Sequence, residues 1–419
     1  MTRVLLATCA EWSHAAGLVP LGWGLRSTGW EVVVATQPAL VHRLAAGGLP
    51  VLAVGRDHRL GQVARRFDVL RRGEPDVDPG GDVDALTADQ MLALHRRLVP
   101  WWWRMVNEPM LADLVAFCRQ WRPDLVVWEA TTFAGAVAAR ACGAAHARFV
   151  WSVDVFARLR ERFLALRRNS DPDPVADWLA GAAARFGVPF CEDLVSGQAT
   201  VTQLPTPLRG ADPPGVDYLP MRFVPYNGRA VVPDWLREPP RRRRVCLTLG
   251  VSRMERFGAY PVPFPDLLDA VADLDADVIA TVPDPSAAGV RTCPDNVRLT
   301  PFVPLDQLLS TCAALVSHGG PGTVCTGVVH GVPQLVFPDH FDGPALAGLL
   351  ARTGAGRVAP ATDPSPDLVR DEVVRLLDDP DHRDAAARLR ETARAAPGPL
   401  EIGADLHRLV RTDSLRRTR

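Results

Sequence analysis

The 419-residue chain contains no lysine, so every positively charged side chain other than a protonated histidine is an arginine. A chain without lysine cannot form a Schiff base through a side-chain amine and cannot carry the lysine of a Walker-type phosphate loop. Its 47 basic and 48 acidic residues leave a formal net charge of −1. This balance excludes a broad cationic surface for nucleic acid and provides no attraction to an anionic membrane.

Long apolar runs are also missing. No segment approaches the ~20 apolar residues of a membrane span, and the apolar N-terminus stops at Glu11 without the basic region or cleavage site of a signal peptide. The eight cysteines are scattered, with no CxxC pair and no Cys/His cluster at zinc-finger spacing. We therefore predict a cytoplasmic protein with buried, reduced cysteines and without a metal site.

What the sequence does contain is an alternation of apolar strand-like runs and helical segments. In the first half, strands are predicted at residues 4–8, 31–35, 123–128 and 146–151, and helices at 15–27 and 132–142. A strand–helix–strand crossover implies parallel strands, so this half is predicted to be an open α/β sheet. Residues 56–85, rich in Arg, Gly, Asp and Pro, are predicted to form a long surface loop.

The α/β pattern restarts after a segment rich in Pro and Gly at residues 203–240. Strands are predicted at residues 244–249, 277–282, 297–302, 313–317 and 334–337, and helical segments at 267–274, 305–310, 367–395 and 400–409. The predicted domains are 1–218 and 241–396, with a linker at 219–240 and a terminal helix in 397–419 that returns toward the first domain. Two such domains leave a cleft near the carboxyl ends of their strands, where ligands bind.

The strongest motif is the sequence VSHGGPGTV at residues 316–324, which follows an apolar strand and precedes a helical segment. Glycines allow the backbone to approach a ligand, and the amides at a helix N-terminus attract an anion. The motif is neither GxxxxGK[ST] nor GxGxxG, which disfavours a P-loop or a nicotinamide site. The alternative is a tight turn without a ligand. The candidate anion-binding residues are His318, Gly319, Gly320, Gly322 and Thr323.

Two carboxylates follow the strand at 334–337. Asp339 and Asp342 are placed at its carboxyl end, where they could accept hydrogen bonds from sugar hydroxyls. For Asp342 the alternative is a helix N-cap.

The first domain offers a candidate base. His14 follows the first strand, and a histidine has a side-chain pKa suited to removing a proton from a hydroxyl. Glu129 lies at the end of the strand predicted at 123–128. Its carboxylate could orient the imidazole of His14 and stabilise the protonated form of that ring. A structural histidine and a surface glutamate are the alternatives.

Tryptophans are the remaining candidates. Trp101, Trp102 and Trp103 are consecutive, so they cannot all face one core. At least one is predicted to line a pocket or an interface, with core packing as the alternative for each. We assign these three and Trp12 to the acceptor or to a partner protein.

Together these segments resemble the GT-B glycosyltransferases of antibiotic biosynthesis over nearly the whole chain, and among them the macrolide desosaminyltransferases. The resemblance implies a GT-B fold, in which two Rossmann-like α/β domains face a central cleft. The N-terminal domain would bind the acceptor and the C-terminal domain the nucleotide sugar. The segments that carry the resemblance are 13–14, 18–21, 143–148, 224–228, 242–250, 294–297, 318–323, 331–334 and 338–339.

By this resemblance, His14 would deprotonate the acceptor hydroxyl, which then attacks the anomeric carbon with inversion. His318 and the amides of Gly320, Gly322 and Thr323 would hold the diphosphate and stabilise its charge as it leaves. The remaining donor contacts implied are Gly250 and Ser252 near the diphosphate or sugar, and Phe302 with the backbone of Val303 at the base.

The implied donor is a dTDP-deoxysugar, the implied acceptor a polyketide aglycone, and no cofactor or metal is required. Relatives carry Gln where this chain has Gly343, which favours a sugar with fewer hydroxyls or an amino sugar. The resemblance also implies an auxiliary P450-like protein without haem function, contacting the N-terminal domain, and leaves open a homodimer. Three alternatives stay open: C-glycosylation of an aromatic polyketide, a dinucleotide oxidoreductase, and a nucleotide-sugar-binding partner without catalysis.

Overall fold

The computed structural model describes residues 1–63, 83–168, 170–250, 254, 260, 262–339, 341–362 and 364–417, with side chains as far as 413. The chain folds into two compact units. The first comprises Met1–Gln203, Ala211–Arg222 and Pro397–Arg419, and the second comprises Leu204–Gly210 and Phe223–Ala396.

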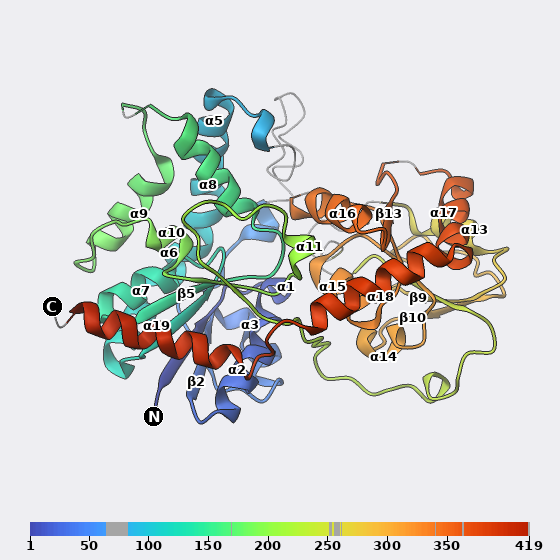
Figure 1. Cartoon of the computed structure of the whole chain (residues 1–419), viewed down its shortest axis with the longest axis horizontal. Helices are drawn as coiled ribbons and strands as arrows, with labels where there is room; N and C mark the ends of the chain where they lie inside the picture. The colour runs from blue at the N-terminus through green and yellow to red at the C-terminus, as the bar shows by residue number, and fades with distance from the viewer. Residues whose placement is uncertain are drawn as a thin grey trace. The chain divides into compact units, whose positions relative to one another are not determined.

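The first unit is built on a sheet of seven parallel strands in the order β3-β2-β1-β4-β5-β6-β7 (Figure 1). Val4, Leu5 and Leu6 of β1 are fully buried, as expected for a parallel strand that has helices on both faces. The four strands predicted in this half are confirmed as β1, β2, β4 and β5. The strands are β1 (Arg3–Ala7), β2 (Glu31–Thr36), β3 (Val51–Ala53), β4 (Leu125–Glu129), β5 (Ala145–Val150), β6 (Thr200–Thr202) and β7 (Tyr218–Pro220).

Helices connect these strands. The helix predicted at 15–27 is two helices, α1 and α2, with Gly17 between them; a Cβ at Gly17 would lie 2.4 Å from Gln203 Oε1. The predicted loop at 56–85 falls largely on residues 64–82, which are outside the described residues. The helices are α1 (Trp12–Ala15), α2 (Leu18–Ser27), α3 (Pro38–Ala45), η1 (Val83–Ala85), α5 (Ala88–Leu98), the π-helix η2 (Val99–Trp103), α6 (Arg104–Trp121), α7 (Ala134–Cys142), α8 (Val155–Leu166), α9 (Pro174–Ala184) and α10 (Asp193–Ser196).

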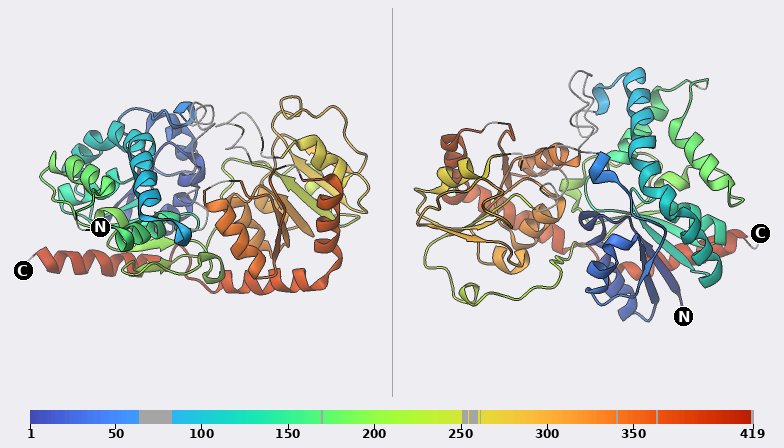
Figure 2. Two further views of the ribbon diagram at one scale, coloured as in Figure 1. Left: turned by 90° about the horizontal axis from the view of Figure 1, so that it is seen from above. Right: turned by 180° about the vertical axis from the view of Figure 1, so that it is seen from behind.

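A last helix, α19 (Ile402–Arg417), belongs to the first unit and is longer than the segment predicted at 400–409. It packs against β5 and β7 and runs along this unit in all three ribbon views (Figure 2). Gln198 Nε2 donates to Asp413 Oδ1 of α19 at 2.7 Å. Gly24 in α2 permits the approach of the preceding segment, because a Cβ there would lie 2.3 Å from the carbonyl oxygen of Pro399.

The second unit has six parallel strands in the order β10-β9-β8-β11-β12-β13, and the five predicted strands are confirmed as β8 to β12. Its core packs strand residues such as Val245, Leu247 and Val316 against Phe264 of α13. The elements are α11 (Thr206–Arg209), η3 (Asp234–Leu236), β8 (Arg244–Thr248), α13 (Phe264–Val271), β9 (Asp277–Thr281), β10 (Val297–Thr300), α14 (Leu305–Leu309), β11 (Ala314–Ser317), α15 (Pro321–His330), β12 (Gln334–Val336), α16 (Asp342–Arg352), β13 (Gly356–Val358), α17 (Pro366–Asp378) and α18 (Pro380–Arg394).

The helical stretch predicted at 367–395 is confirmed, but it is divided into two helices, because α17 ends at Asp378 and α18 begins at Pro380. Asp379 precedes a proline, which disfavours helical backbone, and it adopts φ −81 and ψ 114. Its side chain accepts from the amide of Asp381 and so caps α18.

Each sheet reverses its strand order once. In the first unit the chain builds β1, β2 and β3 outward in one direction and then returns to place β4 on the other side of β1. In the second unit β11 lies beside β8 in the same way. In open α/β sheets, ligands bind at the carboxyl ends of strands at such a switch point. The two switch points, β1/β4 and β8/β11, therefore locate the candidate sites.

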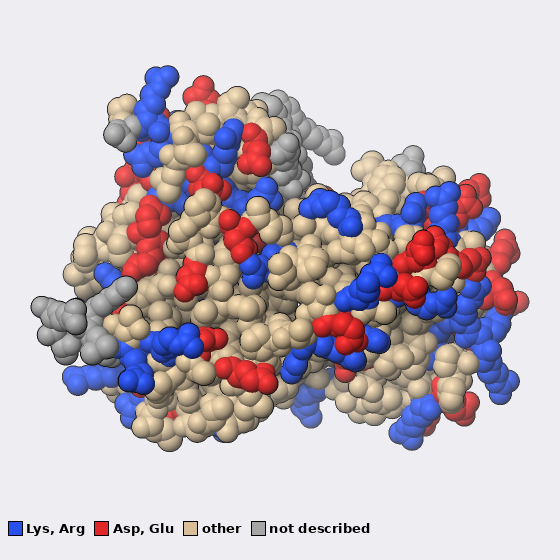
Figure 3. Space-filling model, viewed as in Figure 1, with Lys and Arg blue, Asp and Glu red and all other residues tan. Residues whose placement is uncertain are grey.

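The structure bears on two expectations from composition, the state of the cysteines and the lack of a membrane-spanning segment. All eight cysteines are described and none forms a disulfide, but Cys293 is exposed rather than buried, and Cys142, Cys191 and Cys312 are half-buried. None of the described helices combines the length and apolarity needed to cross a membrane. On the face drawn in Figure 3, acidic and basic side chains are interspersed, in keeping with the near-zero net charge.

Candidate active site

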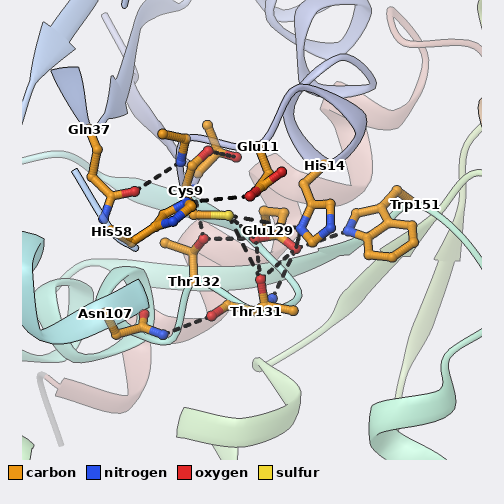
Figure 4. Close-up of polar contacts among 12 residues, drawn as sticks. Cys9, Glu11, His14, Gln37, His58, Asn107, Glu129, Thr131, Thr132 and Trp151 are labelled. Atoms are coloured by element: carbon orange, nitrogen blue, oxygen red, sulfur yellow. Dashed lines mark hydrogen bonds and ion pairs between the residues drawn. The ribbon is translucent and has the colours of Figure 1, made fainter. Parts of the chain in front are cut away.

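His14 and Glu129 meet at the first switch point. β1 ends at Ala7, α1 places His14 above its carboxyl end, and the neighbouring strand β4 ends at Glu129. His14 Nδ1 lies 3.0 Å from Glu129 Oε1 (Figure 4). Both side chains are buried, with 3% and 0% exposed, so the alternative of a surface glutamate is wrong.

The Glu129 carboxylate accepts several hydrogen bonds besides that of the imidazole. The backbone amide of Thr131 donates to Oε1 at 3.0 Å, and the hydroxyl of Thr132 donates to Oε2 at 2.8 Å. The hydroxyl of Thr131 lies 2.9 Å from Oε2. Such a carboxylate is stabilised in its charged form even though it is completely buried.

The pKa of Glu129 reflects this competition. Burial alone raises it, but the charge of His14 and the hydrogen bonds from His14, Trp151 and Thr132 outweigh burial and lower the pKa to about 2. The ionised carboxylate has only acceptor atoms, so the His14 nitrogen that faces it, Nδ1, carries the proton. In the neutral imidazole the other nitrogen, Nε2, then has a free lone pair and can accept a proton.

Trp151 is a member of this cluster that the sequence analysis missed. Its indole Nε1 donates to Glu129 Oε1 at 2.9 Å, and its ring packs against the imidazole of His14 with centroids 4.4 Å apart. The residue directly follows β5, the neighbour of β4. The rule that the carboxyl ends of neighbouring parallel strands meet at one edge could therefore have found it.

Cys9 completes the cluster. It is 1% exposed, and its thiol donates to Glu129 Oε2 at 3.6 Å. Its Sγ lies 3.9 Å from His14 Nδ1. Burial, and next the negative charge of Glu129, raise the pKa of this thiol well above its usual range.

Asn107 fixes the turn that follows Glu129. Its side-chain amide donates to the carbonyl oxygen of Thr131 at 2.8 Å, and its Oδ1 accepts from the amide of Ala134 at 2.8 Å. On the other side of the cluster, His58 Nε2 lies 3.7 Å from Glu11 Oε1. The two hydrogen bonds of Asn107 therefore tie the turn after β4 to α6.

The tryptophans predicted to meet an acceptor or partner lie in different environments. Trp101 is 52% exposed, Trp102 is half-buried, and Trp103 is 3% exposed. Trp103 packs in the core of the first unit, with its ring 5.4 Å from that of Phe133. Trp12 is half-buried and lies 4.0 Å from the guanidinium of Arg43. The three consecutive indoles therefore do face different surroundings, as predicted.

At the second switch point the imidazole of His318 packs between the backbones of Gly250 and Gly320. A Cβ at Gly250, which follows β8, would lie 2.6 Å from His318 Cε1, and a Cβ at Gly320 would lie 2.6 Å from His318 Nε2. Contacts this short do not occur, so the imidazole occupies the space that side chains at both positions would need. Gly250 also has φ +67, a conformation that favours glycine.

The glycine-rich motif leads into α15 as predicted. Gly320 is the N-cap residue and Pro321 the first residue of the helix. The amides of Gly322 and Thr323 belong to the first turn, where backbone N–H groups have no partner within the helix. Gly319 has φ +82, and its amide donates to Ser317 Oγ at 3.2 Å. This end of the helix has the geometry of an anion site.

The other residues predicted to contact the donor differ in solvent exposure. Val303 is buried and Phe302 is 52% exposed, while Ser252 lies outside the described residues. Asp339 follows β12 and is half-buried. The N-cap alternative for Asp342 is wrong, because Asp342 is the first residue of α16 and Phe341, with φ 62, occupies the cap position.

Two parallel α/β units with candidate sites at their switch points fit the predicted GT-B fold, and a comparison with solved structures shows it. The glycosyltransferase VinC, crystallised with dTDP, superposes with a TM-score of 0.87 at 38% identity, covering 98% of this chain and 100% of that one. Residues 23–250 and 265–409 match the N-terminal and C-terminal domains described as erythromycin biosynthesis protein CIII-like. The chain belongs to this EryCIII-like family of glycosyltransferases.

Curated relatives match over almost the full length. The 10-deoxymethynolide desosaminyltransferase of Streptomyces venezuelae is 44% identical over 97% of both chains. The aklavinone 7-beta-L-rhodosaminyltransferase of Streptomyces galilaeus is 41% identical over 97% of this chain and 96% of the relative. The predicted fold, family and enzyme class are therefore confirmed, and the oxidoreductase and non-catalytic alternatives are wrong.

Proposed function

We propose that this enzyme transfers a deoxysugar from a dTDP-sugar to a hydroxyl of a polyketide aglycone, with inversion and without a metal. The observation that carries this proposal is the buried His14–Glu129 pair at 3.0 Å, at the switch point of the first unit. The relatives that transfer desosamine to a macrolide and rhodosamine to aklavinone support the classes of donor and acceptor.

His14 would act as the general base through Nε2. Because Nδ1–H is held by Glu129, the lone pair of Nε2 is available to the acceptor hydroxyl. The hydroxyl oxygen attacks the anomeric carbon as its proton passes to Nε2, and the bond to the diphosphate oxygen breaks on the opposite face. Ionised Glu129 would stabilise the imidazolium that forms.

The second unit would hold the donor. His318 and the first-turn amides of α15 would bind the diphosphate and stabilise the charge that grows on it as it leaves. The packing of His318 against Gly250 and Gly320 supports this role, because it fixes the ring at the start of the helix. VinC, with dTDP bound, is a relative with the same fold.

The finer donor contacts belong to the same proposal. Phe302 and the backbone of Val303 would meet the thymine, Ser252 and Gly250 would lie near the diphosphate or sugar, and Asp339 and Asp342 would accept from sugar hydroxyls. The exposed ring of Phe302 is available to stack on a base.

Transfer assays test the proposal directly. The enzyme is incubated with dTDP-desosamine or UDP-glucose and with a macrolactone or aklavinone, each with and without a P450-like auxiliary protein. We expect transfer only from the dTDP-deoxysugar, and more of it with the auxiliary protein. The anomeric configuration and the linkage atom of the product, read by NMR, distinguish inversion from retention and O- from C-glycosylation. Transfer from UDP-glucose alone would contradict the proposed donor class.

The auxiliary protein follows from the family resemblance, whereas the resemblance leaves a homodimer open. A sedimentation experiment on the enzyme alone and mixed with the auxiliary protein measures both assemblies. Turnover that is identical in both mixtures would remove the auxiliary protein from the proposal.

A further inference from the structure

The first switch point brings together a thiol, an imidazole and a carboxylate. Cys9 Sγ, His14 Nδ1 and a Glu129 carboxylate oxygen all lie within 4.8 Å of one another, and all three side chains are buried (Figure 4). They come from the loop after β1, from α1 and from the end of β4. These are the three kinds of ligand that zinc sites in proteins use.

The spacing of these atoms fits a tetrahedral metal ion. With Zn–S about 2.3 Å and Zn–N and Zn–O about 2.0–2.1 Å, neighbouring ligand atoms of a tetrahedral site lie about 3.3–3.6 Å apart. Here the Sγ–Nδ1 distance is 3.9 Å, the Sγ–Oε2 distance is 3.6 Å and the Nδ1–Oε1 distance is 3.0 Å. The two carboxylate distances are to different oxygens, Oε2 toward Cys9 and Oε1 toward His14. A metal ion would therefore bind both oxygens, or the carboxylate would rotate so that one oxygen serves as the ligand, which keeps the three ligand atoms within 4.8 Å of one another.

The charges also match. A thiolate and a carboxylate together neutralise a divalent cation, so the complex as a whole carries no net charge. This matters because Cys9 is 1% exposed and Glu129 is 0% exposed, and a buried net charge would be costly. Thr131 and Thr132 already hold the carboxylate in place and would act as outer contacts that orient this ligand.

We propose that Cys9, His14 and Glu129 form a binding site for a thiophilic divalent cation such as Zn²⁺, and that its occupation switches the enzyme off. On binding, the Cys9 thiol releases its proton to solvent and Sγ bonds to the metal. The metal takes the Nδ1 position of His14, so the ring proton moves to Nε2. Nε2 then has no lone pair for the acceptor hydroxyl. The loss of activity, though not metal binding itself, rests on the proposed role of His14 as base.

The ligand set predicts which metals act. A sulfur–nitrogen–oxygen site favours Zn²⁺ or Co²⁺, whereas Mg²⁺ prefers oxygen ligands alone. Inhibition by Zn²⁺ and Co²⁺ but not by Mg²⁺ is therefore expected.

Cobalt spectroscopy tests metal binding without an activity assay. The full chain is freed of metal with a chelator and titrated with Co²⁺. We expect a sulfur-to-cobalt charge-transfer band whose intensity saturates at one metal ion per chain. Cys9→Ser should remove the band. The matched control is Cys191→Ser, which removes the thiol that lies beside Asp193 in the same unit and should leave the band intact.

Wild-type protein provides a second readout in case Cys9→Ser does not fold. X-ray absorption of the zinc-loaded chain should show one sulfur and otherwise nitrogen or oxygen neighbours. Circular dichroism and urea unfolding of Cys9→Ser against wild type report whether the first unit, which holds Cys9, is folded. A band that persists in Cys9→Ser, a band lost in Cys191→Ser, or a zinc shell without sulfur would each overturn the site.

Activity separates this inference from the proposed function. At saturating Zn²⁺, transfer should fall about 10²-fold, and TDP affinity should not change, because the donor motif belongs to the other unit. Cobalt binding with transfer undiminished would overturn the inhibition and the assignment of His14 as base, while leaving the metal site established by its spectrum. Absence of any charge-transfer band in an active enzyme would overturn the metal site and leave the proposed function standing.

Discussion

The two switch points have the same topology but differ in the chemistry that they present. At β1/β4 the functional atoms belong to side chains, Cys9, His14 and Glu129, which are 0–3% exposed. At β8/β11 the polypeptide backbone dominates, with three glycines and the first turn of α15 around one half-buried histidine. The same topology therefore carries the proposed proton acceptor at one switch point and the proposed anion site at the other.

The difference in chemistry agrees with what each proposed task requires. Removing a proton needs one imidazole nitrogen kept free, so the other must be held by a buried acceptor such as Glu129. Binding a diphosphate needs several N–H donors that can approach the anion closely, which glycine and a helix N-terminus supply. The first arrangement depends on residues far apart in the chain, whereas the second comes mostly from one short segment, with Gly250 as the distant member.

The largest expected effect is on the base. His14→Ala should lower the transfer rate by about 10²–10⁴-fold, because it removes the imidazole that Glu129 holds with Nε2 available for the proton. Affinity for TDP should not change. The measurement is steady-state transfer alongside calorimetric titration with TDP. Transfer at the wild-type rate would refute the assignment of His14 as base.

Exchanging the carboxylate tests how the base is held. In Glu129→Gln the new amide can donate to Nδ1, which would place the ring proton on Nε2 and block the base. We expect the transfer rate to fall by about 10²-fold. NMR of labelled histidine gives the tautomer directly. A variant that keeps Nδ1–H and more than half of the activity would show that the carboxylate is not what positions the ring.

The second switch point can be disturbed through a single methyl group. Gly320 has backbone angles that alanine can adopt, φ −58 and ψ 134, but the new Cβ would lie 2.6 Å from His318 Nε2. Gly320→Ala should therefore displace the ring and weaken TDP binding by about tenfold, the equivalent of 1.4 kcal/mol. The matched control is Gly348→Ala within α16, where a Cβ would meet Arg352 Nη1 at 3.8 Å, an ordinary van der Waals contact. Equal TDP affinity in both variants would remove His318 from the donor site.

A smaller effect is expected at Trp151. Trp151→Phe keeps a ring against His14 but removes the hydrogen bond to Glu129, so we expect about a threefold to tenfold loss of kcat, with a shifted pH profile and little change in KM. Trp178→Phe is the matched control, since the Trp178 indole N–H has no hydrogen-bond partner among the described residues. Equal losses in both variants would indicate a packing effect alone.

The smallest expected effect is on stability at low pH, which tests whether Glu129 is ionised in the folded protein. The pKa of Glu129 is lowered from 4.5 to about 2, so its contribution to the free energy of unfolding is complete above pH 4.5 and is lost as the pH falls toward 2. At pH 7 the free energy of unfolding of wild type should exceed that of Glu129→Gln by about 3 kcal/mol at most. At pH 3.5 this difference should be smaller. Urea unfolding of both proteins at the two pH values measures it. A gap that is unchanged would mean that Glu129 is not held as an ion.

The sequence predicted nine of the thirteen described strands, because buried parallel strands are continuous apolar runs, as at Val4 to Leu6. It missed β3, β6, β7 and β13, which have only three residues each. It predicted the turn around His318 because all of that motif lies within nine residues. It missed Trp151 and did not connect Cys9 with Glu129, because 120 residues separate that pair and only the pairing of β1 with β4 brings them together. The break at Asp379 was missed although Pro380 marks it, because the helical periodicity continues on both sides.

The central claim is that the first switch point accepts the proton and the second binds the diphosphate. It is tested most directly by TDP titration of His14→Ala and His318→Ala against wild type. The account predicts that His318→Ala weakens TDP binding at least about tenfold, whereas His14→Ala binds TDP like wild type and yet has lost transfer. If His14→Ala lost TDP affinity to the same degree, or if His318→Ala bound TDP normally, the assignment of proton transfer to one unit and anion binding to the other would be wrong.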